Sequence, residues 1–198
     1  MQMKVAILID GGHLRAGAKQ ARKTYDKDFI EAFARGCVAG DEYLLRILYY
    51  DSPQYRGQKS LPISGRPHQF TASDKWMVDL AKRDRFAVRR GTLAFRGWKP
   101  KALPLKQTAV DLVDTDFDPI FEQKGVDMRV GLDIATLSNE RLVDRIVLVS
   151  GDTDMIPAMK HARKAGVEVV TVQLPKPAMG LHDQIMAHCD SVRPVVWP

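Results

Sequence analysis

Two aspartates stand where an apolar block gives way to a helical pattern, in IVLVSGDTDMIPAMKHARKAG at residues 146–166. The block before Asp152 and Asp154 is rich in β-branched residues, which is typical of a strand buried on both faces of a parallel sheet. A third aspartate, Asp10, ends a similar block at residues 4–10. The carboxyl ends of parallel strands meet at one edge of a sheet. We therefore expect these three carboxylates to share a crevice, provided that the two strands are neighbours.

A fourth aspartate, Asp127, lies where a loop enters a predicted helix, from which its side chain could reach the same crevice. Carboxylates at such short range repel one another, and without a cation some of them would become protonated. Oxygen ligands with no histidine or cysteine partner suit Mg²⁺ or Mn²⁺ better than Zn²⁺. Such an ion can activate water and stabilise the charge on a phosphoryl group. The residue types therefore predict a metal-dependent reaction at a phosphate.

Each aspartate also has a simpler explanation as a helix cap. Asp127, Asp152 and Asp154 stand at predicted helix starts, where an N-cap stabilises a helix by about 1 kcal/mol. For Asp10 a cap is less persuasive, because Gly11 and Gly12 follow it before the predicted helix. Both explanations stay open for each residue, although four such positions together favour a site.

Predicted strands and helices alternate along the chain and must position these side chains. Strands are predicted at residues 4–10, 42–52, 145–150 and 167–174, with a further strand or hairpin at 86–95 that turns at Gly91. Helices are predicted at residues 13–22, 28–38, 74–84, 127–138, 154–165 and 179–188. This alternation predicts an α/β fold with a mainly parallel central sheet and helices on both faces.

Two predicted surface loops, residues 51–72 and 96–108, combine basic side chains with an aromatic one. The frequency of proline and glycine argues against regular elements in the first of them. The net charge of +6 favours an anionic partner such as nucleic acid. Lys99 and Lys101 are candidate phosphate contacts, and Tyr55 and Trp98 are candidate faces for base stacking. The alternative, that both loops are merely solvated connections, stays open.

The length of 198 residues suits one sizeable hydrophobic core, so we predict a single domain over residues 1–198. We expect neither a membrane span nor a signal peptide, and therefore a cytoplasmic location. Cys37 and Cys189 are the only cysteines, which argues against a disulfide framework and a thiolate zinc site. Assembly into a homo-oligomer stays open.

Three segments carry a resemblance to a known family. They are ILIDGGHL at 7–14, KGVDMRVGLDI at 124–134 and VLVSGDTDMIPAMKHARKAGVEV at 147–169. They resemble the signature segments of NYN domains, specifically the LabA-like bacterial branch of the PIN-like nuclease superfamily. LYYDS at 48–52 and LHDQIMAHCDSV at 181–192 also fit that pattern.

The resemblance implies a PIN-like, Rossmann-like three-layer α/β/α sandwich. It also implies a metal-dependent endoribonuclease. We expect its substrate to be single-stranded RNA or unpaired parts of folded RNA. Carried over by position, Asp10, Asp127, Asp152 and Asp154 are the catalytic residues and hold Mg²⁺ or Mn²⁺.

Other residues in these segments are candidates for binding substrate or for orienting the aspartates. His13 stands where family members commonly have asparagine, and it is either a titratable hydrogen-bond donor at the site or a helix-surface residue. Lys124 could contact a phosphate as a point charge. Ser150 and Thr153 flank Asp152 and could orient it. Asp133 lies on another face of its helix, so we expect it to have a supporting or structural role.

The serious alternative is a non-catalytic RNA-binding or protein-interaction module of the same fold. Clustered carboxylates beside a phosphate path argue against it, because they repel RNA unless a cation neutralises them. Phosphatases of the haloacid-dehalogenase type need an Asp-x-Asp pair after the first strand, where this chain has Asp10-Gly11-Gly12. The glycine patterns of dinucleotide-binding and P-loop proteins are also missing, as is the G-x-S-x-G motif of common serine hydrolases.

Overall fold

The computed structural model describes residues 2–102 and 111–198. A six-stranded, wholly parallel sheet forms its centre, in the order β10-β9-β8-β1-β2-β5. The strands are β1 (Met3–Asp10), β2 (Glu42–Asp51), β5 (Phe86–Arg90), β8 (Arg145–Val149), β9 (Glu168–Gln173) and β10 (Ser191–Pro194). The predicted α/β class with a mainly parallel sheet is confirmed. We did not predict β10, because its sequence SVRP contains no apolar run.

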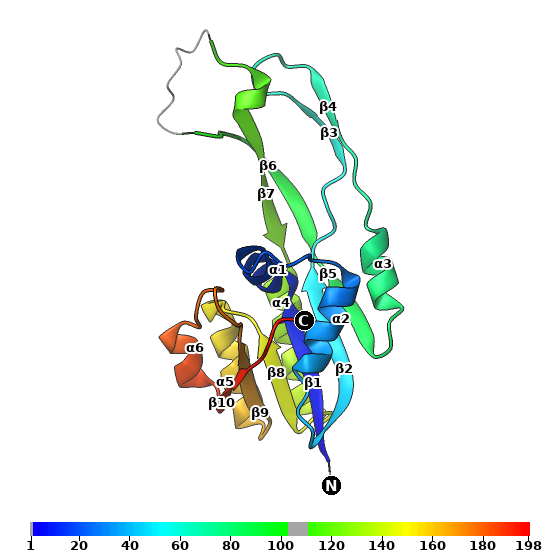
Figure 1. Ribbon diagram of the computed structural model, residues 1–198, viewed down its shortest axis with the longest axis vertical. Helices are drawn as coiled ribbons and strands as arrows, with labels where there is room; N and C mark the ends of the chain where they lie inside the picture. The colour runs from blue at the N-terminus through cyan, green and yellow to red at the C-terminus, as the bar shows by residue number, and fades with distance from the viewer. Residues whose placement is uncertain (1, 103–110) are drawn as a thin grey trace.

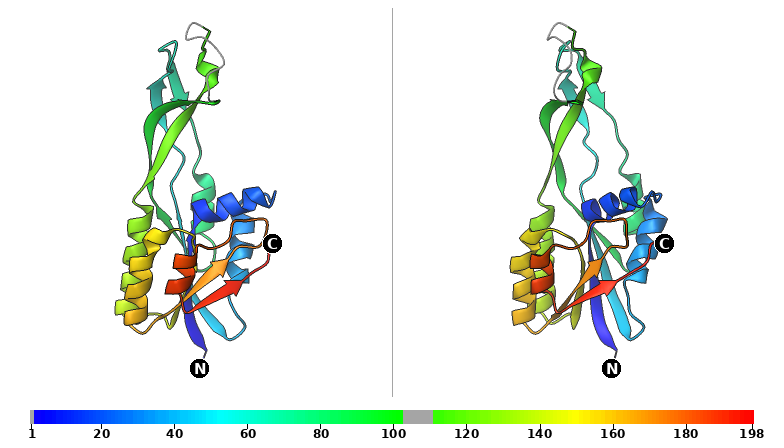
Figure 2. Two further views of the ribbon diagram at one scale, coloured as in Figure 1. Left: turned by 90° about the vertical axis from the view of Figure 1, so that its left-hand side faces the viewer. Right: turned by 60° about the vertical axis from the view of Figure 1, so that its left-hand side comes forward.

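Helices cover both faces of this sheet and complete the three layers (Figures 1 and 2). One face carries α1 (Gly11–Gln20), α2 (Lys27–Gly36) and the end of α3 (Lys75–Ala81). The other face carries α4 (Val126–Asn139), α5 (Ile156–Lys164) and α6 (Asp183–His188). Two short 3₁₀ turns, η1 (Asp114–Asp116) and η2 (Thr153–Met155), lie in the connections. The PIN-like sandwich expected from the resemblance is the observed architecture.

Strand β1 shows why the sheet needs both helical layers. Val5, Ile7 and Ile9 pack toward α1 and α2, whereas Ala6 and Leu8 pack toward α4 and α5. All five are completely buried. Since successive side chains of a strand point to opposite faces, a continuous apolar run buries both faces at once.

Helix α1 begins at Gly11, directly after Asp10. Our expectation that the two glycines would precede the helix was wrong, because the Asp10 side chain accepts hydrogen bonds from the first turn and starts the helix early. Gly11 cannot be replaced there without displacement of its neighbours. A Cβ at Gly11 would lie 2.4 Å from Tyr49 Oη and 2.8 Å from Asp51 Oδ2. The close approach fixes the start of α1 over the end of β2.

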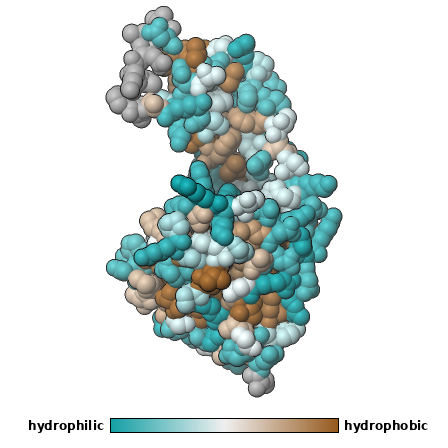
Figure 3. Space-filling view, in the orientation of Figure 1, coloured by the Kyte–Doolittle hydropathy of each residue, from teal (hydrophilic) through white to brown (hydrophobic). Residues whose placement is uncertain are grey.

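Two antiparallel hairpins project from the carboxyl end of the sheet and form what we call the arm, residues 53–73 and 92–124 where described (Figures 1 and 3). One pairs β3 (Gly57–Ser60) with β4 (Pro67–Phe70), and the other pairs β6 (Thr92–Pro100) with β7 (Phe117–Lys124). The predicted loop at 51–72 was therefore wrong. The predicted loop at 96–108 was wrong for residues 96–100, which continue β6, and its residues 103–108 lie outside the described chain. The hairpin at 86–95 was also wrong, because β5 joins the central sheet and β6 pairs with β7.

Aromatic packing explains why these proline- and glycine-containing segments form strands. Phe95 of β6 lies directly opposite Phe121 of β7, and their ring centroids are 6.0 Å apart. Phe70 of β4 lies 5.6 Å from Phe121, and Tyr55 lies 5.5 Å from Phe70. Aromatic pairs across strands stabilise hairpins by about 0.2–1 kcal/mol each. The arm thus has a small core of its own, separate from the two faces of the sheet.

The last predicted helix is shorter than expected. It begins at Asp183, with His182 as its N-cap, and residues 179–182 instead form a loop beside the aspartates. Cys37 and Cys189 are free thiols, as expected. In the described ranges, no helix combines the length and the apolar character that a membrane span requires.

Candidate functional site

A crevice of about 770 Å³ lies beyond the ends of β1 and β8. These strands are neighbours, with Ile9 paired to Val149, so the condition for bringing the aspartates together is met. The connection after β1 leads to β2 on one side, and the one after β8 leads to β9 on the other. Such a switch in strand order opens the binding site in α/β sheets. The lining is Asp10, Gly12, His13, Gln123, Val126, Asp127, Gly151, Asp152 and residues 179–183.

Asp10 is held by the first turn of α1. Its Oδ1 accepts hydrogen bonds from the backbone N–H of Gly12 at 2.9 Å and of His13 at 3.2 Å. Its Oδ2 accepts a long hydrogen bond of 3.5 Å from Ser150 Oγ. Burial raises the pKa of Asp10, although the hydrogen bonds and the nearby His13 oppose that shift. Asp10 is therefore a helix cap and a crevice carboxylate at once, and the two explanations do not exclude each other.

Asp152 and Asp154 lie in the turn after β8. Asp152 caps η2, where its Oδ1 accepts a hydrogen bond of 2.9 Å from the backbone N–H of Asp154. The backbone N–H of Asp152 in turn donates to Ser150 Oγ at 3.2 Å. Ser150 is 1% exposed, so this buried hydroxyl links the turn to Asp10. Thr153 is the first residue of η2, and Asp154 is exposed.

Asp127 lies in the first turn of α4 and is not its N-cap, which is Gly125 with a left-handed φ of 75°. Burial raises the pKa of Asp127, and the negative charges of Asp152, Asp10 and Asp154 raise it further. Asp10, Asp152 and Asp154 therefore lie close enough to act on Asp127, although Asp154 is not part of the crevice lining. No lysine or arginine is among the described residues that line the crevice. The negative charge is left uncompensated by the side chains around it.

The donor set fits a hard divalent cation in its chemistry. Carboxylate oxygens are the usual protein ligands of Mg²⁺ and Mn²⁺, and mutual repulsion favours a cation between them. Nonetheless, within residues 2–102 and 111–198 no three His, Cys, Asp or Glu side chains converge as a group that could hold an ion. The exposed side chains of Asp127 and Asp154 would have to turn toward Asp10, or water would have to complete the ligand shell, as is usual for Mg²⁺.

His13 lines the crevice and is not a helix-surface residue. Its half-buried ring packs against Gly151, where a Cβ would lie only 2.9 Å from His13 Cε1. Its Nε2 is buried without a hydrogen-bond partner among the described residues. Burial lowers the pKa of His13, although the negative charge of Asp10 opposes this shift. His13 thus places an imidazole nitrogen without a hydrogen-bond partner beside the aspartates.

The remaining predicted substrate contacts lie outside the crevice lining. Lys124 ends β7 and is exposed, with its Nζ 3.9 Å from Glu122. Lys99 is exposed on β6, and Lys101 lies 3.9 Å from Asp118. Trp98 belongs to the aromatic core of the arm, and its indole N–H donates to the Ser60 carbonyl at 3.0 Å.

Tyr55 also packs in the arm core, against Phe70, Phe95 and Phe121. Only part of each ring is therefore exposed for stacking.

Asp133 supports the fold, as expected. Its Oδ2 accepts hydrogen bonds of 2.8 Å both from Tyr50 Oη and from Arg89 Nε. These partners lie on β2 and β5, so Asp133 fastens α4 to the sheet.

We did not predict a role for Asp51, although it ends a strand just as Asp10 does. Asp51 is 2% exposed and forms an ion pair with Arg15 of α1. Its Oδ2 also accepts a 2.9 Å hydrogen bond from Tyr49 Oη. The matching position at the end of a buried strand was the available signal. Gln123 and the loop at 179–182 were missed as well, and no local pattern marks them as crevice residues.

Comparison with known proteins agrees with this arrangement. The NYN domain family matches residues 4–192, which is nearly the whole chain. The chain therefore belongs to the NYN domain family, which lies within a nuclease-like superfamily whose members typically use divalent metals. A search of curated proteins finds no significant match.

Among solved structures, the chain is similar to a protein of unknown function from Vibrio parahaemolyticus RIMD 2210633. The TM-score is 0.53 at 15% identity, over 98% of this chain and 93% of that chain. At that identity the likeness shows the fold alone.

Proposed function

We propose that this protein is a Mg²⁺- or Mn²⁺-dependent endoribonuclease that cleaves phosphodiester bonds in single-stranded RNA or in unpaired parts of folded RNA. The observation that carries the proposal is the crevice at the β1–β8 switch point, which Asp10, Asp127 and Asp152 line together, with Asp154 close to Asp127 and no lysine or arginine in the described lining. Membership of the NYN domain family supports a nuclease, and the signature segments favour its LabA-like branch.

Each crevice residue has a part in this proposal. Asp10, Asp127, Asp152 and Asp154 would hold the ion, which when bound supplies an activated water and stabilises charge on the phosphoryl group. The first turn of α1 fixes Asp10, and Ser150 fixes the turn that carries Asp152. The unpartnered Nε2 of His13 is buried, so it would donate a hydrogen bond to a phosphate oxygen after the ring turns toward the crevice, with the proton on that nitrogen.

The arm offers the RNA a path outside the crevice. Lys99 and Lys101 are exposed on the arm, and Lys124 lies at its base, three residues before Asp127. We infer that these lysines contact backbone phosphates, which binds RNA without reading its sequence. Trp98 and Thr153 complete the set of proposed substrate contacts. We further propose a single domain over residues 1–198, a cytoplasmic location and the option of a homo-oligomer.

A non-catalytic RNA-binding or protein-interaction module of the same fold remains the second candidate. One observation favours it: within the described chain, the aspartate side chains do not converge as a metal-binding group. The two candidates differ in whether the crevice cuts RNA when metal is supplied.

Cleavage of an unpaired RNA oligonucleotide with Mg²⁺, with Mn²⁺ and with excess EDTA is the direct test. We expect cleavage only with metal. Asp152→Asn should lower it by more than the roughly 10–100-fold that follows loss of a residue supporting a metal ligand. The matched control is Asp41→Asn, an exposed aspartate at the opposite end of the sheet, which should cut like the parent. Cleavage that persists in EDTA would refute the metal mechanism, and no cleavage under any of these conditions would favour the module.

A further inference from the structure

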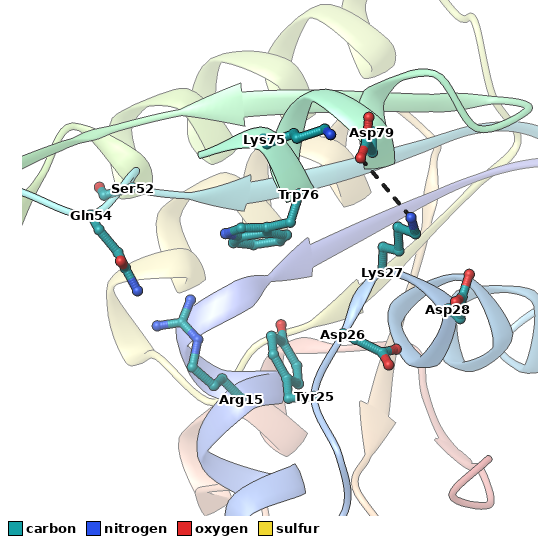
Figure 4. A pocket seen from close by; sticks show the side chains of 10 residues that line it. All are labelled: Arg15, Tyr25, Asp26, Lys27, Asp28, Ser52, Gln54, Lys75, Trp76 and Asp79. Atoms are coloured by element: carbon teal, nitrogen blue, oxygen red, sulfur yellow. Dashed lines mark ion pairs between the residues drawn. The ribbon is translucent and has the colours of Figure 1, made fainter. Parts of the chain in front are cut away.

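A second cavity, of about 750 Å³, lies beyond the end of β2 on the face covered by α1 and α2 (Figure 4). Its lining shares no residue with the crevice. Trp76 of α3 lies across this cavity from Arg15 of α1 and from Tyr25, which precedes α2. Ser52 and Gln54, from the segment after β2, close one side.

Trp76 presents an aromatic surface that the fold leaves partly exposed. Its ring and the buried Tyr49 ring form a T-shaped pair, with the centroids 6.1 Å apart and an interplanar angle of 79°. That contact holds the indole against the core. The rest of the half-buried ring is available to a planar ligand in the cavity.

Contacts with neighbouring side chains hold the Arg15 guanidinium in place. It pairs with the buried Asp51, and its guanidinium lies 5.7 Å from the centre of the Tyr25 ring. Tyr49 donates to Asp51 at 2.9 Å and shares a 2.7 Å hydrogen bond with Tyr25. The Arg15 side chain nevertheless remains 48% exposed. A cation fixed before binding loses less conformational entropy when a ligand arrives.

The acidic side chains around this cavity already have partners. Asp26 caps α2 by accepting from Phe29 N–H at 2.8 Å, and Asp28 pairs with Arg83. Asp79 lies 4.0 Å from Lys27, as the dashed line in Figure 4 marks.

Lys75 lines the same cavity, is exposed and has no ion pair within the described residues. The cavity thus offers a ligand the aromatic face of Trp76, the ammonium group of Lys75 and the guanidinium of Arg15, which pairs with Asp51 yet remains 48% exposed. Together these match a base that carries a phosphate.

The cavity and the crevice lie on different sides of the same helix, α1. His13 lines the crevice and Arg15 lines the cavity. Because these residues are two positions apart in α1, their side chains leave the helix about 200° apart around its axis. Crevice and cavity thus flank the start of α1. The helix is about 10 Å wide, which equals the rise of roughly three stacked nucleotides. A single strand can therefore occupy both sites.

We propose that this cavity binds one nucleotide, with its base against Trp76 and its phosphate at Arg15 and Lys75. The occupant is an unpaired nucleotide of the RNA strand whose neighbouring bond lies in the crevice, and in this respect the inference rests on the proposed function. A free mononucleotide has the same chemistry, so the test includes both sources.

The test uses tryptophan fluorescence and the anisotropy of a labelled RNA, both in EDTA so that the RNA stays uncut. The parent protein of this test carries Trp98→Phe, because Trp98 is itself a proposed RNA contact and would otherwise contribute to the quenching. Single-stranded RNA should quench the fluorescence of the parent protein. In Trp76→Phe the anisotropy should still report binding, because phenylalanine keeps an aromatic face, whereas the quenching should be lost. Trp76→Leu should weaken RNA binding about 5- to 150-fold, the usual range for loss of one stacked base.

Surface variants keep the test decisive if Trp76→Leu fails to fold. Lys75→Ala with Gln54→Ala changes two exposed side chains of the lining and should weaken RNA binding. The charge-matched control Lys164→Ala, on α5 and outside the cavity, should weaken it less. Adenosine monophosphate is the second probe: quenching by it at similar concentrations would assign the cavity to free nucleotides, and quenching by RNA alone would assign it to the strand.

Two results would overturn the inference. One is quenching that persists in Trp76→Phe, and the other is RNA affinity that stays unchanged in every cavity variant. Neither depends on cleavage. Binding at Trp76 without cleavage in Mn²⁺ would refute the proposed function alone, and cleavage with unaltered binding in the variants would refute the cavity alone.

Discussion

At the amino-terminal end of the sheet Glu42 is buried between two arginines, whereas at the carboxyl end Asp10 lies near three further aspartates. Glu42 begins β2 and accepts hydrogen bonds from Arg193 at 2.6 and 2.9 Å, and Arg145 donates a further one. Burial opposes its ionisation, but the hydrogen bonds from Arg193, from the Ala39 N–H and from Arg145 outweigh that effect and lower the pKa of Glu42 to about 2. The pKa values of Asp10 and Asp127 are instead raised.

The same sheet therefore neutralises buried carboxylates at one end and leaves them uncompensated at the other. Asp51 sharpens the contrast, because it lies at the carboxyl end beside Asp10 and does have a cationic partner, Arg15. The fold can supply an arginine at this edge, yet the described crevice lining contains no arginine or lysine. The difference teaches that a charge neutralised by the protein supports folding, whereas a charge left open is available to a ligand.

The largest expected effect on stability comes from removing Glu42, the neutralised carboxylate at the amino-terminal end of the sheet. Glu42→Ala leaves Arg193 without a carboxylate partner and leaves Arg145 with Glu168 alone, and the two arginine side chains are only 17% and 14% exposed. Loss of one partner from a buried ion pair costs about 3–5 kcal/mol, which urea denaturation will measure as a lower free energy of unfolding. The control Glu122→Ala removes the exposed partner of Arg96 in the arm and should leave the free energy of unfolding nearly unchanged, because exposed ion pairs contribute little to stability.

The pH dependence has a definite sign. The folded pKa of Glu42 lies below its ordinary value of 4.5, so its contribution to stability is complete above about pH 4.5 and is lost as the pH falls toward 2. The parent should therefore lose more stability than Glu42→Gln over that range. Equal losses, or a cost below about 1 kcal/mol for Glu42→Ala, would show that this network does not neutralise the charge as described.

A smaller change in the free energy of unfolding is expected when a cation binds the aspartates at the carboxyl end of the sheet. At a free Mn²⁺ concentration of about 100 times its dissociation constant, binding to the folded state alone adds about 2.7 kcal/mol to the free energy of unfolding. Asp127→Asn and Asp152→Asn should each reduce that gain, because each removes a proposed ligand. Thermal denaturation with and without Mn²⁺ measures it, and Asp41→Asn should respond like the parent. A gain of the same size in all the variants would place the ion elsewhere.

The main sheet was predictable because its strands are continuous apolar runs, and such runs report burial locally. The position of Asp10, Asp152 and Asp154 after those runs was equally local. Their meeting depended on β1 and β8 being neighbours, which no local pattern encodes and which the structure supplies.

Features that depend on contacts between distant segments escaped prediction. The arm strands owe their stability to rings from separate segments, such as Phe70 and Phe121, so their sequences appear irregular when taken one at a time. The His13 ring is half-buried because Gly151 leaves room for it, although the two residues are far apart in the chain. The early start of α1 was not predicted either, although its cause is a local contact. A local hydrogen bond from Gly12 to Asp10 offsets the poor helix propensity of two glycines.

The smallest expected effect concerns how RNA approaches an acidic crevice. Because the described lining has no lysine or arginine, the phosphates of the strand must be met by cations outside it, and Lys99 and Lys101 are exposed on the arm. On a single strand, each neutralised phosphate contributes about 0.7 to the slope of log affinity against log salt. The double change to alanine should therefore flatten the slope by about 1.4. Between 50 and 200 mM salt, the variant would lose roughly sevenfold less affinity than the parent.

This measurement needs a protein that binds without cutting, such as Asp152→Asn in EDTA, and a control for charge alone. Lys160→Ala with Lys164→Ala removes two exposed lysines from α5, away from the arm, and should leave the slope nearly unchanged. If the arm pair and the α5 pair flatten the slope equally, the RNA responds only to net charge. The arm would then be no more than a support for β6 and β7. If only the arm pair flattens the slope, phosphate binding and metal binding lie in different parts of the molecule. The arm then binds the phosphates, and the aspartates of the crevice bind the cation.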